Sequence, residues 1–328
     1  MIVPTIAKLI VREHLYKPIQ GKVLTLGRQT IALSYEQAID LLRKEEFEPS
    51  SDILRTIVVD QDQRTRVGKG TGFITDDRFF GLLGITELQT MDVTEYEGCD
   101  IVHNLNQPIP ESLFGQYDFI IDGGTFDHLF DLRVAFENVV KMLKIGGRII
   151  QWNAASNFNG AAYLSFGPDF FYDFYVLNQF SDCKVYIAEV DDIGQLEHWD
   201  FYEFEGTDSY AHFRSNRIQM TLVLAEKGSL STYDKIPVQA QYRDQSLWSS
   251  YRRAKDSIKQ SSRKPWVGSI ASFPSAIKPY TGALGRSLIR LKDKVPVEWR
   301  RRFPYGVKAM AVAMLPKQIT GYIYRGKI

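Results

Sequence analysis

The sequence contains little cysteine: 2 residues, Cys99 and Cys183, in a chain of 328. They lie far apart and have neither a CxxC pairing nor the histidine spacing of a zinc site. A disulfide framework and a Cys/His metal site are therefore disfavoured. We expect both cysteines to be buried free thiols.

Long apolar runs are also absent. No run approaches the roughly 18 to 20 residues that span a bilayer, and residues 1–14 lack the small-residue cleavage pattern of a signal peptide. These absences disfavour a membrane-spanning or secreted chain and predict a cytoplasmic protein. Hydrophobic residues make up 44% of the chain, so we expect one large domain, alone or with an appendage.

The glycine-rich dinucleotide-binding motif is absent as well. Dinucleotide-binding enzymes carry GxGxxG after their first strand, whereas this chain has LTLGRQT at residues 24–30, in which Gly27 is the one glycine. A nucleotide-dependent dehydrogenase is therefore disfavoured.

Charge is nearly balanced over the whole chain but is divided unevenly along it. The formal net charge is +1, yet residues 230–328 hold 20 Lys and Arg against 5 Asp and Glu. Residues 1–229 hold 20 Lys and Arg against 34 Asp and Glu. We therefore predict a domain over 1–229 and a basic, partly helical C-terminal extension over 230–328. The extension suits an anionic partner or a membrane surface, with nucleic acid less favoured, and packing against the acidic domain explains it equally well.

The strongest pattern lies between Tyr117 and Trp152. Phe119-Ile120-Ile121 reads as a short buried strand that ends in the polar turn Asp122-Gly123-Gly124. After Leu132 the apolar residues recur at helical spacing.

A Gly146-Gly147 pair predicts the end of that helix, and a second strand is expected to begin at Arg148. This order of strand, helix and parallel strand places residues 122–128 at the carboxyl ends of the strands, where ligands bind in such sheets.

Shorter patterns predict the other elements. An amphipathic helix is expected within residues 1–20, and Ser34 is expected to cap a helix over Tyr35–Lys44. Residues 46–72 read as a long loop that either acts as a lid or is an ordinary disordered excursion, and residues 191–216 read as an aromatic, acidic insertion. Further elements are predicted in this order: a strand at 22–27, a helix at 78–83, strands at 87–92 and 101–104, an aromatic helix at 168–180, and strands at 185–188 and 220–225.

The C-terminal extension contains no repeat. A basic helix is expected at 251–259 and a Ser/Pro-rich linker at 261–279. Basic and aromatic residues are interleaved over 288–302, a pattern that suits a phosphate or a membrane interface and also an ordinary solvated surface. The segment Ala309 to Leu315, with Ile319, Tyr322 and Ile323, is expected to dock on the acidic domain.

The words YDFIID, GTFDH and MLKIGGRII resemble the fourth-strand and fifth-strand motifs of class I S-adenosylmethionine-dependent methyltransferases. The resemblance spans residues 21–228. It implies an α/β fold with a doubly wound, seven-stranded, mainly parallel Rossmann-like sheet, in which the strands at 185–188 and 220–225 form an antiparallel pair at the edge. It also implies S-adenosylmethionine as the cofactor.

The resemblance assigns cofactor-binding residues to four strand ends. The turn after the first strand, with Leu26, Gly27, Arg28 and Gln29, is where the family holds the methionine moiety. Asp92 ends the second strand, where a carboxylate can bind both ribose hydroxyls, although it could instead cap the following turn. The other candidates are Asn104 beside the adenine, and Asp122 and Gly123 after the fourth strand.

The first motif departs from the family pattern. Thr25 stands where an acid is usual, and Arg28 and Gln29 stand where glycines let the backbone approach the ligand. Two interpretations stay open. Either Arg28 or Gln29 supplies hydrogen bonds to a slightly shifted cofactor, or the site no longer binds it.

His128 is the candidate catalytic base, because imidazole titrates near neutral pH and Asp127 could orient its ring. In the resembling family this acid-His pair also serves site architecture alone. A metal held by Asp122, Asp127 and Asp131 is disfavoured, because no histidine or cysteine spacing supports it. The acceptor is expected near His128 and Asn153.

The sequence therefore supports two functions. The first is a methyltransferase that moves a methyl group from S-adenosylmethionine to an oxygen or nitrogen of a small molecule or a sugar or glycan intermediate. The second is a non-catalytic methyltransferase-like module whose basic tail binds an anionic partner or a membrane surface. The sequence leaves the oligomeric state open.

Overall fold

The computed structural model describes residues 1–56, 63–190, 199–206, 212–261, 319–320 and 322–327. The helices are α1 (Pro4–Tyr16), α2 (Tyr35–Lys44), α3 (Ser51–Thr56), α4 (Asp76–Leu82), α5 (Leu132–Met142), α6 (Pro168–Leu177) and α7 (Gln245–Ser261), with short 3-10 turns at η1 (Glu111–Leu113), η2 (Phe126–His128) and η3 (Ala240–Tyr242). The strands are β1 (Lys22–Leu26), β2 (Glu87–Asp92), β3 (Ile101–Val102), β4 (Tyr117–Asp122), β5 (Leu143–Ser156), β6 (Asp182–Val190), β7 (Asp200–Phe204), β8 (His212–Phe213), β9 (Ile218–Glu226), β10 (Ile319–Thr320) and β11 (Tyr322–Lys327).

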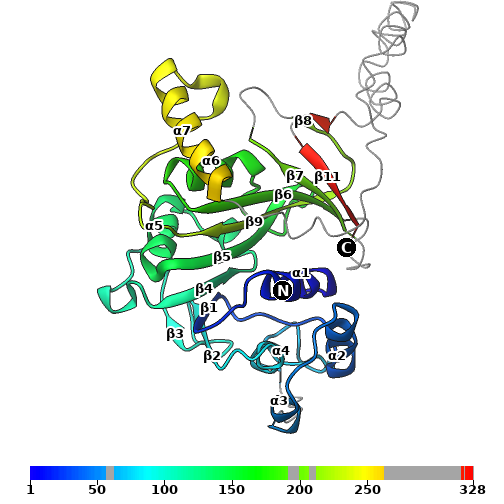
Figure 1. Ribbon diagram of the computed structural model, residues 1–328. Helices are drawn as coiled ribbons and strands as arrows, with labels where there is room; N and C mark the ends of the chain where they lie inside the picture. The colour runs from blue at the N-terminus through cyan, green and yellow to red at the C-terminus, as the bar shows by residue number, and fades with distance from the viewer. Residues whose placement is uncertain (57–62, 191–198, 207–211, 262–318, 321, 328) are drawn as a thin grey trace, which may run out of the picture.

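The described strands form a mixed sheet of nine in the order β11-β7-β6-β9-β5-β4-β1-β2-β3 (Figure 1). The five strands from β5 to β3 are parallel, and β9, β6, β7 and β11 follow in antiparallel pairings. The parallel half agrees with the prediction. The predicted total of seven strands is wrong, because two further strands lie beyond the antiparallel pair.

The two additional strands come from segments without a clear strand pattern. β7 lies inside the segment that was predicted to be an insertion, and the backbone of β11 pairs with it, Ile323 opposite Glu203. β6 and β9 are paired as predicted but lie inside the sheet. The C-terminal end of the chain thus joins the sheet of the first predicted domain, while the division at residue 230 stays a prediction.

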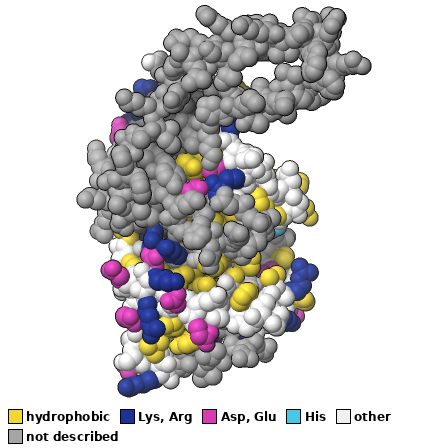
Figure 2. All heavy atoms as spheres, turned by 90° about the vertical axis from the view of Figure 1, so that its right-hand side faces the viewer, with side chains coloured by type: hydrophobic (Ala, Val, Ile, Leu, Met, Phe, Trp, Pro, Cys, Tyr) yellow, Lys and Arg dark blue, Asp and Glu magenta, His cyan; other side chains and the backbone are white. Residues whose placement is uncertain are grey.

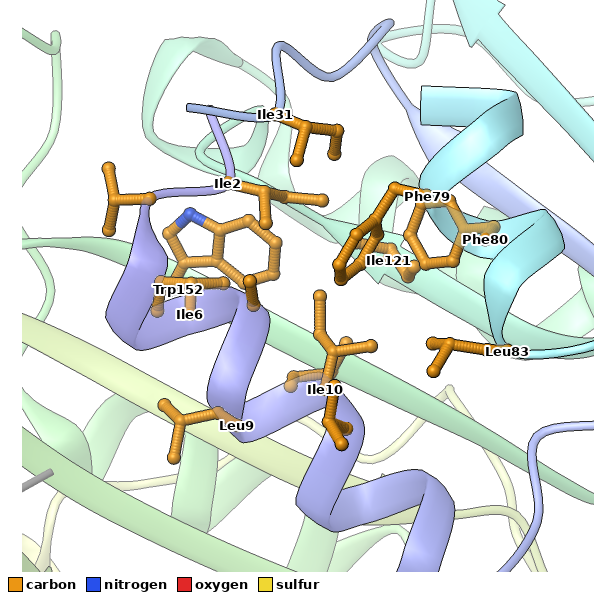
Figure 3. Packing of buried hydrophobic residues seen from close by; sticks show 14 of the residues in the cluster. Ile2, Ile6, Leu9, Ile10, Ile31, Phe79, Phe80, Leu83, Ile121 and Trp152 are labelled. Atoms are coloured by element: carbon orange, nitrogen blue, oxygen red, sulfur yellow. The ribbon is translucent and has the colours of Figure 1, made fainter. Parts of the chain in front are cut away.

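Helices cover both faces of the sheet, as a doubly wound fold requires (Figure 1). On one face, Ile6 and Ile10 of α1 pack with Trp152 and Ile121 of the sheet and with Phe79 of α4 (Figure 3). On the other face, α5, α6 and α7 bury a second cluster. Burial on both faces explains why β4 carries the unbroken apolar run Phe119-Ile120-Ile121 and why successive residues of β1 and of the second half of β5 are buried.

Helix starts follow their capping residues. Ser34 accepts a hydrogen bond from the Gln37 backbone, and the Gln37 side chain returns one to Ser34, so α2 begins with a capping box as predicted. Asp131 caps α5 through the Val134 backbone at 3.2 Å.

The predicted end of α5 is wrong. The helix ends at Met142, because Leu143 is already extended and pairs with Tyr117. The next pair is Phe119 with Arg148, so residues 144–147 form an irregularity inside β5. Gly146 has a φ of 81° there, a conformation that favours glycine. The Gly-Gly pair therefore bends a strand instead of ending a helix.

Two other predictions need correction. Residues 46–72 contain the short helix α3, and the apolar segment 57–59 lies outside the described residues. The third strand is confined to Ile101–Val102, where four residues were predicted, because the chain turns away from β2 after His103 donates to the Asp92 carbonyl at 2.8 Å.

Helix α1 is tied to the sheet by charge as well as by packing. Arg148 of β5 forms a buried ion pair with Glu13 and donates to the Lys17 carbonyl at 2.7 Å. On the face that carries α2, acidic and basic side chains are interspersed (Figure 2), and they include the exposed pair of Lys44 and Asp40 at 2.7 Å.

Apart from Ser261 at the end of α7, the predicted linker, the basic-aromatic stretch up to residue 302 and the segment 309–315 lie outside the described residues, whereas the basic helix at 251–259 is part of α7. Within the described ranges, no helix has the length and apolar character needed to cross a membrane.

Candidate functional site

The site lies at the topological switch point of the parallel sheet, where the connections after neighbouring strands run to opposite faces. β1 sits between β2 and β4, with Leu26 opposite both Met91 and Asp122. The chain leaves β1 toward α2 on one face and leaves β4 toward α5 on the other. The carboxyl ends of the two strands therefore diverge, which is the usual ligand position in open α/β sheets.

Gly27 brings three of the predicted positions together. Its φ is +74°, and its backbone nitrogen donates to the Met91 carbonyl at 2.6 Å. A Cβ atom at Gly27 would lie 3.8 Å from Asp92 Oδ2 and 3.9 Å from Gln29 Nε2. Asp92 is half-buried, and its Oδ1 accepts a hydrogen bond from the Val93 backbone at 2.6 Å. Oδ2 is thus the carboxylate atom that faces the Gly27 turn.

Gln29 lies across this turn. Its Nε2 donates to the carbonyls of Leu26 at 3.2 Å and Gly27 at 3.1 Å. The side chain lies against Gly123, and a Cβ atom at Gly123 would overlap Gln29 Oε1. Gln29 is 4% exposed, and among the described residues its Oε1 has no hydrogen-bond donor. The turn therefore holds a buried acceptor without a partner.

The Arg28 side chain is bonded to α4 and to the end of the loop after β2. Its guanidinium pairs with the Asp76 carboxylate at 3.0 Å and donates to Thr90 Oγ1 at 3.1 Å and to the Gly98 carbonyl at 2.7 Å. Both residues of the ion pair are buried. Arg28 is thus held beneath the loop that follows β2, apart from Gln29 and Asp92. Its sequence-based assignment to the cofactor stays a prediction, although this side chain is already bonded to protein.

Asp122 is fully buried and organises the turn after β4. Its Oδ1 accepts hydrogen bonds from the backbones of Thr125 at 2.7 Å and Phe126 at 3.3 Å. Its Oδ2 accepts from Gln151 at 3.0 Å and Asn153 at 2.9 Å. Burial raises the pKa of Asp122, and these four donors oppose that shift.

Asn104 follows β3 and is half-buried. Its Oδ1 accepts hydrogen bonds from the backbone of Asn106 at 3.0 Å and from the Asn106 side chain at 2.9 Å. The oxygen that the sequence assigns to the adenine amino group therefore already has two donors.

Asp127 and His128 form the predicted acid-His pair on η2. Asp127 Oδ1 lies 3.7 Å from His128 Nε2, and Asp127 Oδ2 accepts from the Ala154 backbone at 3.0 Å. The Asp127 side chain is 6% exposed, and burial raises its pKa to about 6. The His128 side chain is 55% exposed, so its ring can reach a molecule above the strand ends.

Asn153, expected in a loop beside the acceptor, is a fully buried residue of β5. It donates to Asp122 and accepts from the Asp127 backbone at 3.2 Å, so it joins the two turns and does not face outward. The prediction that Asn153 lies in a loop is therefore wrong, whereas the acceptor position near it stays a prediction.

The sequence reasoning missed Thr125, whose hydroxyl donates to the Leu26 carbonyl at 2.7 Å. It joins the turn after β4 to the end of β1. A threonine three residues after a strand-ending aspartate is a turn signal, and that signal could have identified it.

No protein-family model matches the sequence, and no curated protein matches it significantly. Solved structures match at low similarity. A SAM-dependent methyltransferase from Archaeoglobus fulgidus is 10% identical with a TM-score of 0.36, covering 68% of this chain and 94% of that one. The CMeT domain structure of the citrinin polyketide synthase is 10% identical with a TM-score of 0.34, covering 69% of this chain and 52% of that one.

A Burkholderia thailandensis 1,6-didemethyltoxoflavin-N1-methyltransferase, with bound S-adenosylhomocysteine, is 10% identical with a TM-score of 0.29. It covers 67% of this chain and 76% of its own. The chain thus spans about half the length of the polyketide synthase structure and most of the other two. Similarities of this size do not assign the chain to a family.

Proposed function

We propose that this chain is an S-adenosylmethionine-dependent methyltransferase that acts on an oxygen or nitrogen of a small molecule or a sugar or glycan intermediate. One observation carries the proposal. At the topological switch point of the parallel sheet, a carboxylate oxygen of Asp92 and the amide nitrogen of Gln29 lie beside the Gly27 turn, and the unpartnered buried oxygen of the same amide lies against Gly123.

These residues fit the chemistry of the cofactor. Asp92 Oδ2 can accept hydrogen bonds from ribose hydroxyls, and a charged acceptor makes such bonds strong. Gln29 Oε1 can accept from the ammonium group of the methionine moiety, which would give this buried oxygen a partner. The bound cofactor supplies an electrophilic methyl group.

The protein's remaining task is to position the acceptor and to accept its proton. His128 is the residue we propose for the proton, because its exposed ring stands next to the strand ends. Asp127 is the positioning residue, with Oδ1 at 3.7 Å from Nε2.

A second candidate function is supported by the same glutamine. Its two hydrogen bonds to Leu26 and Gly27 hold the amide across the turn, and the side chain fills the space over Gly123. A closed turn of this kind favours a non-catalytic module, with the basic extension as the part that binds an anionic partner or a membrane surface.

Calorimetric titration of the full chain with S-adenosylmethionine and S-adenosylhomocysteine tests the proposal. We expect micromolar binding, at least about tenfold weaker in Asp92→Asn and in Gln29→Ala, because each variant loses a hydrogen bond to a charged group. Glu95→Gln is the matched control. It changes an exposed acid in the loop after β2 and should bind within about twofold of the wild type.

Whether a smaller residue at position 29 weakens or restores cofactor binding distinguishes the two functions. If the wild type shows no heat and Gln29→Gly binds, the turn is closed in the natural chain, and the module is the better description. If neither binds while both are folded, the cofactor assignment itself is wrong.

The acceptor, the methylated atom and the partner of the basic extension belong to the proposal as well. Once binding is established, a panel of hydroxyl and amine acceptors can be screened for transfer of a labelled methyl group. His128→Ala should then lower turnover by about 100-fold or more and leave S-adenosylhomocysteine affinity unchanged.

A further inference from the structure

A pocket of about 530 Å³ lies between α5 and α6 and shares no lining residue with the polar site at the strand ends. The segment 233–239 forms its third wall. This volume lies within the range of about 300 to 1,000 Å³ that small-molecule sites occupy. Binding in this pocket does not depend on the function proposed above.

Five of the fifteen lining residues are aromatic, and four of their rings pack against each other. Phe136 of α5 is stacked on Phe174 of α6 with ring centroids 3.9 Å apart. Phe166 and Phe170 are stacked at 5.0 Å. All four rings line the pocket. Because the rings pack in two stacked pairs, the apolar wall is formed before any ligand arrives.

Four charged side chains also line the pocket, and the acids among them have partners. Asp173 forms a buried ion pair with Arg243 at 2.5 Å, and Asp169 accepts a hydrogen bond from Gln239 at 3.0 Å. Arg133 and Lys235 are the bases, and within the described ranges neither side chain has an ion-pair partner. The pocket therefore combines an aromatic wall with two cations that form no ion pair and one carboxylate, Asp169, whose partner Gln239 is neutral, so that positive charge is in excess.

We infer that this pocket binds an apolar carboxylate, with its hydrocarbon part among the four phenylalanines and its carboxylate at Arg133 and Lys235. The apolar part gains by leaving water, and the carboxylate accepts hydrogen bonds from the two cations that are stronger than those a neutral hydroxyl accepts, because both partners are charged. The aromatic walls accept aliphatic chains and flat rings alike, so the class includes fatty acids and aryl acids.

The pocket adjoins the polar site through two short connections. Phe166 donates its backbone hydrogen to the Ala154 carbonyl at 2.7 Å, and the Ala154 backbone in turn donates to Asp127. On the other side, Leu132 of the pocket lies four residues after His128. The pocket wall is thus connected to the acid-His pair through the hydrogen bonds of Ala154 and through the chain between His128 and Leu132.

Calorimetric titration of the full chain with decanoate and with 2-naphthoate, each beside its neutral alcohol, tests the inference. We expect at least one acid to bind with a dissociation constant below about 1 mM and at least about tenfold more tightly than its alcohol. Equal affinity for acid and alcohol, or no binding of either acid, would overturn it.

Variants locate the binding. Arg133→Gln with Lys235→Gln should weaken the acid about tenfold or more and leave the alcohol unchanged. The matched control is Arg43→Gln with Lys69→Gln, two exposed bases outside the pocket, which should have no effect. Ser165→Trp, which places a ring in the pocket mouth, should abolish binding of the acid. Undiminished binding in Ser165→Trp, with the fold intact by circular dichroism, would place the ligand elsewhere and overturn the assignment.

Discussion

The amide of Gln29 rests on the backbone of Gly123, in space that any side chain at position 123 would occupy. Gly123 has no Cβ atom, and this is what lets the turn after β1 and the turn after β4 touch. The two motifs that the sequence places almost a hundred residues apart are therefore one packed unit in the structure.

This contact predicts a non-additive pair of substitutions. Gly123→Ala should lower the free energy of unfolding by about 1 to 3 kcal/mol, because the new methyl group displaces Gln29. The double variant Gly123→Ala/Gln29→Ala should recover most of that loss, since it removes the overlapping amide. Urea unfolding of the four proteins gives the coupling energy. Additive losses would show that the two side chains do not share this space.

The buried pair of Arg28 and Asp76 predicts a large loss of stability. Asp76→Ala leaves the Arg28 guanidinium buried without its carboxylate, which costs about 3 to 5 kcal/mol. Asp77→Ala removes the adjacent, exposed acid and should cost less than about 0.5 kcal/mol. Denaturant titration compares them, and similar losses in both variants would contradict a structural role for Arg28.

Replacing Asp122 should lower the free energy of unfolding because hydrogen bonds are lost, and not because the net charge changes. In Asp122→Asn, the new NH2 group must face either the two backbone donors or the donors of Gln151 and Asn153. One donor pair is then unsatisfied, and we expect a cost of about 2 to 4 kcal/mol. Asp40→Asn on the exposed face of α2 is the control. An unchanged unfolding midpoint in Asp122→Asn would mean that the carboxylate is dispensable for the turn.

Asp127 predicts a pH dependence of stability with a definite sign. Its pKa is about 6 in the folded chain against 3.8 for an ordinary aspartate, so the folded state binds more protons between these values. Stability should therefore fall as the pH rises from about 4 to 6, by about 3 kcal/mol from this group.

Asp127→Asn should lack this decrease and be the more stable protein at pH 7.5. Urea unfolding of both proteins at several pH values isolates the contribution of this residue as the difference between the two curves. A constant difference across this range would contradict the elevated pKa.

Much of the parallel half could be predicted because its signals are local. The apolar run Phe119-Ile120-Ile121 forms β4, and Ser34 begins α2 where its capping pattern indicated. Each of these signals needs only a few neighbouring residues, because burial on both faces or a single cap sets the outcome.

The predictions that were wrong concern residues whose structure depends on partners far away in the sequence. Leu143 continues the apolar pattern of α5, yet it becomes strand because Tyr117 offers a backbone to pair with. Asn153 reads as a loop residue, and only the neighbouring Asp122 shows why it is buried. In the site itself, Asp92 lies beside Gly27 as the strand order implies. The orientation of the Arg28 side chain, in contrast, depends on its ion pair with Asp76 of α4.

The pairing of β7 with β11 also sets an order of events during synthesis. β7 leaves the ribosome more than one hundred residues ahead of β11, so its outer backbone groups stay unpaired while the intervening chain is made. An open strand edge is a template for pairing with other chains. The nascent protein is thus most exposed to aggregation just before its last strand arrives, and slowing translation over residues 262–318 should lower the soluble yield more than slowing it over residues 1–56.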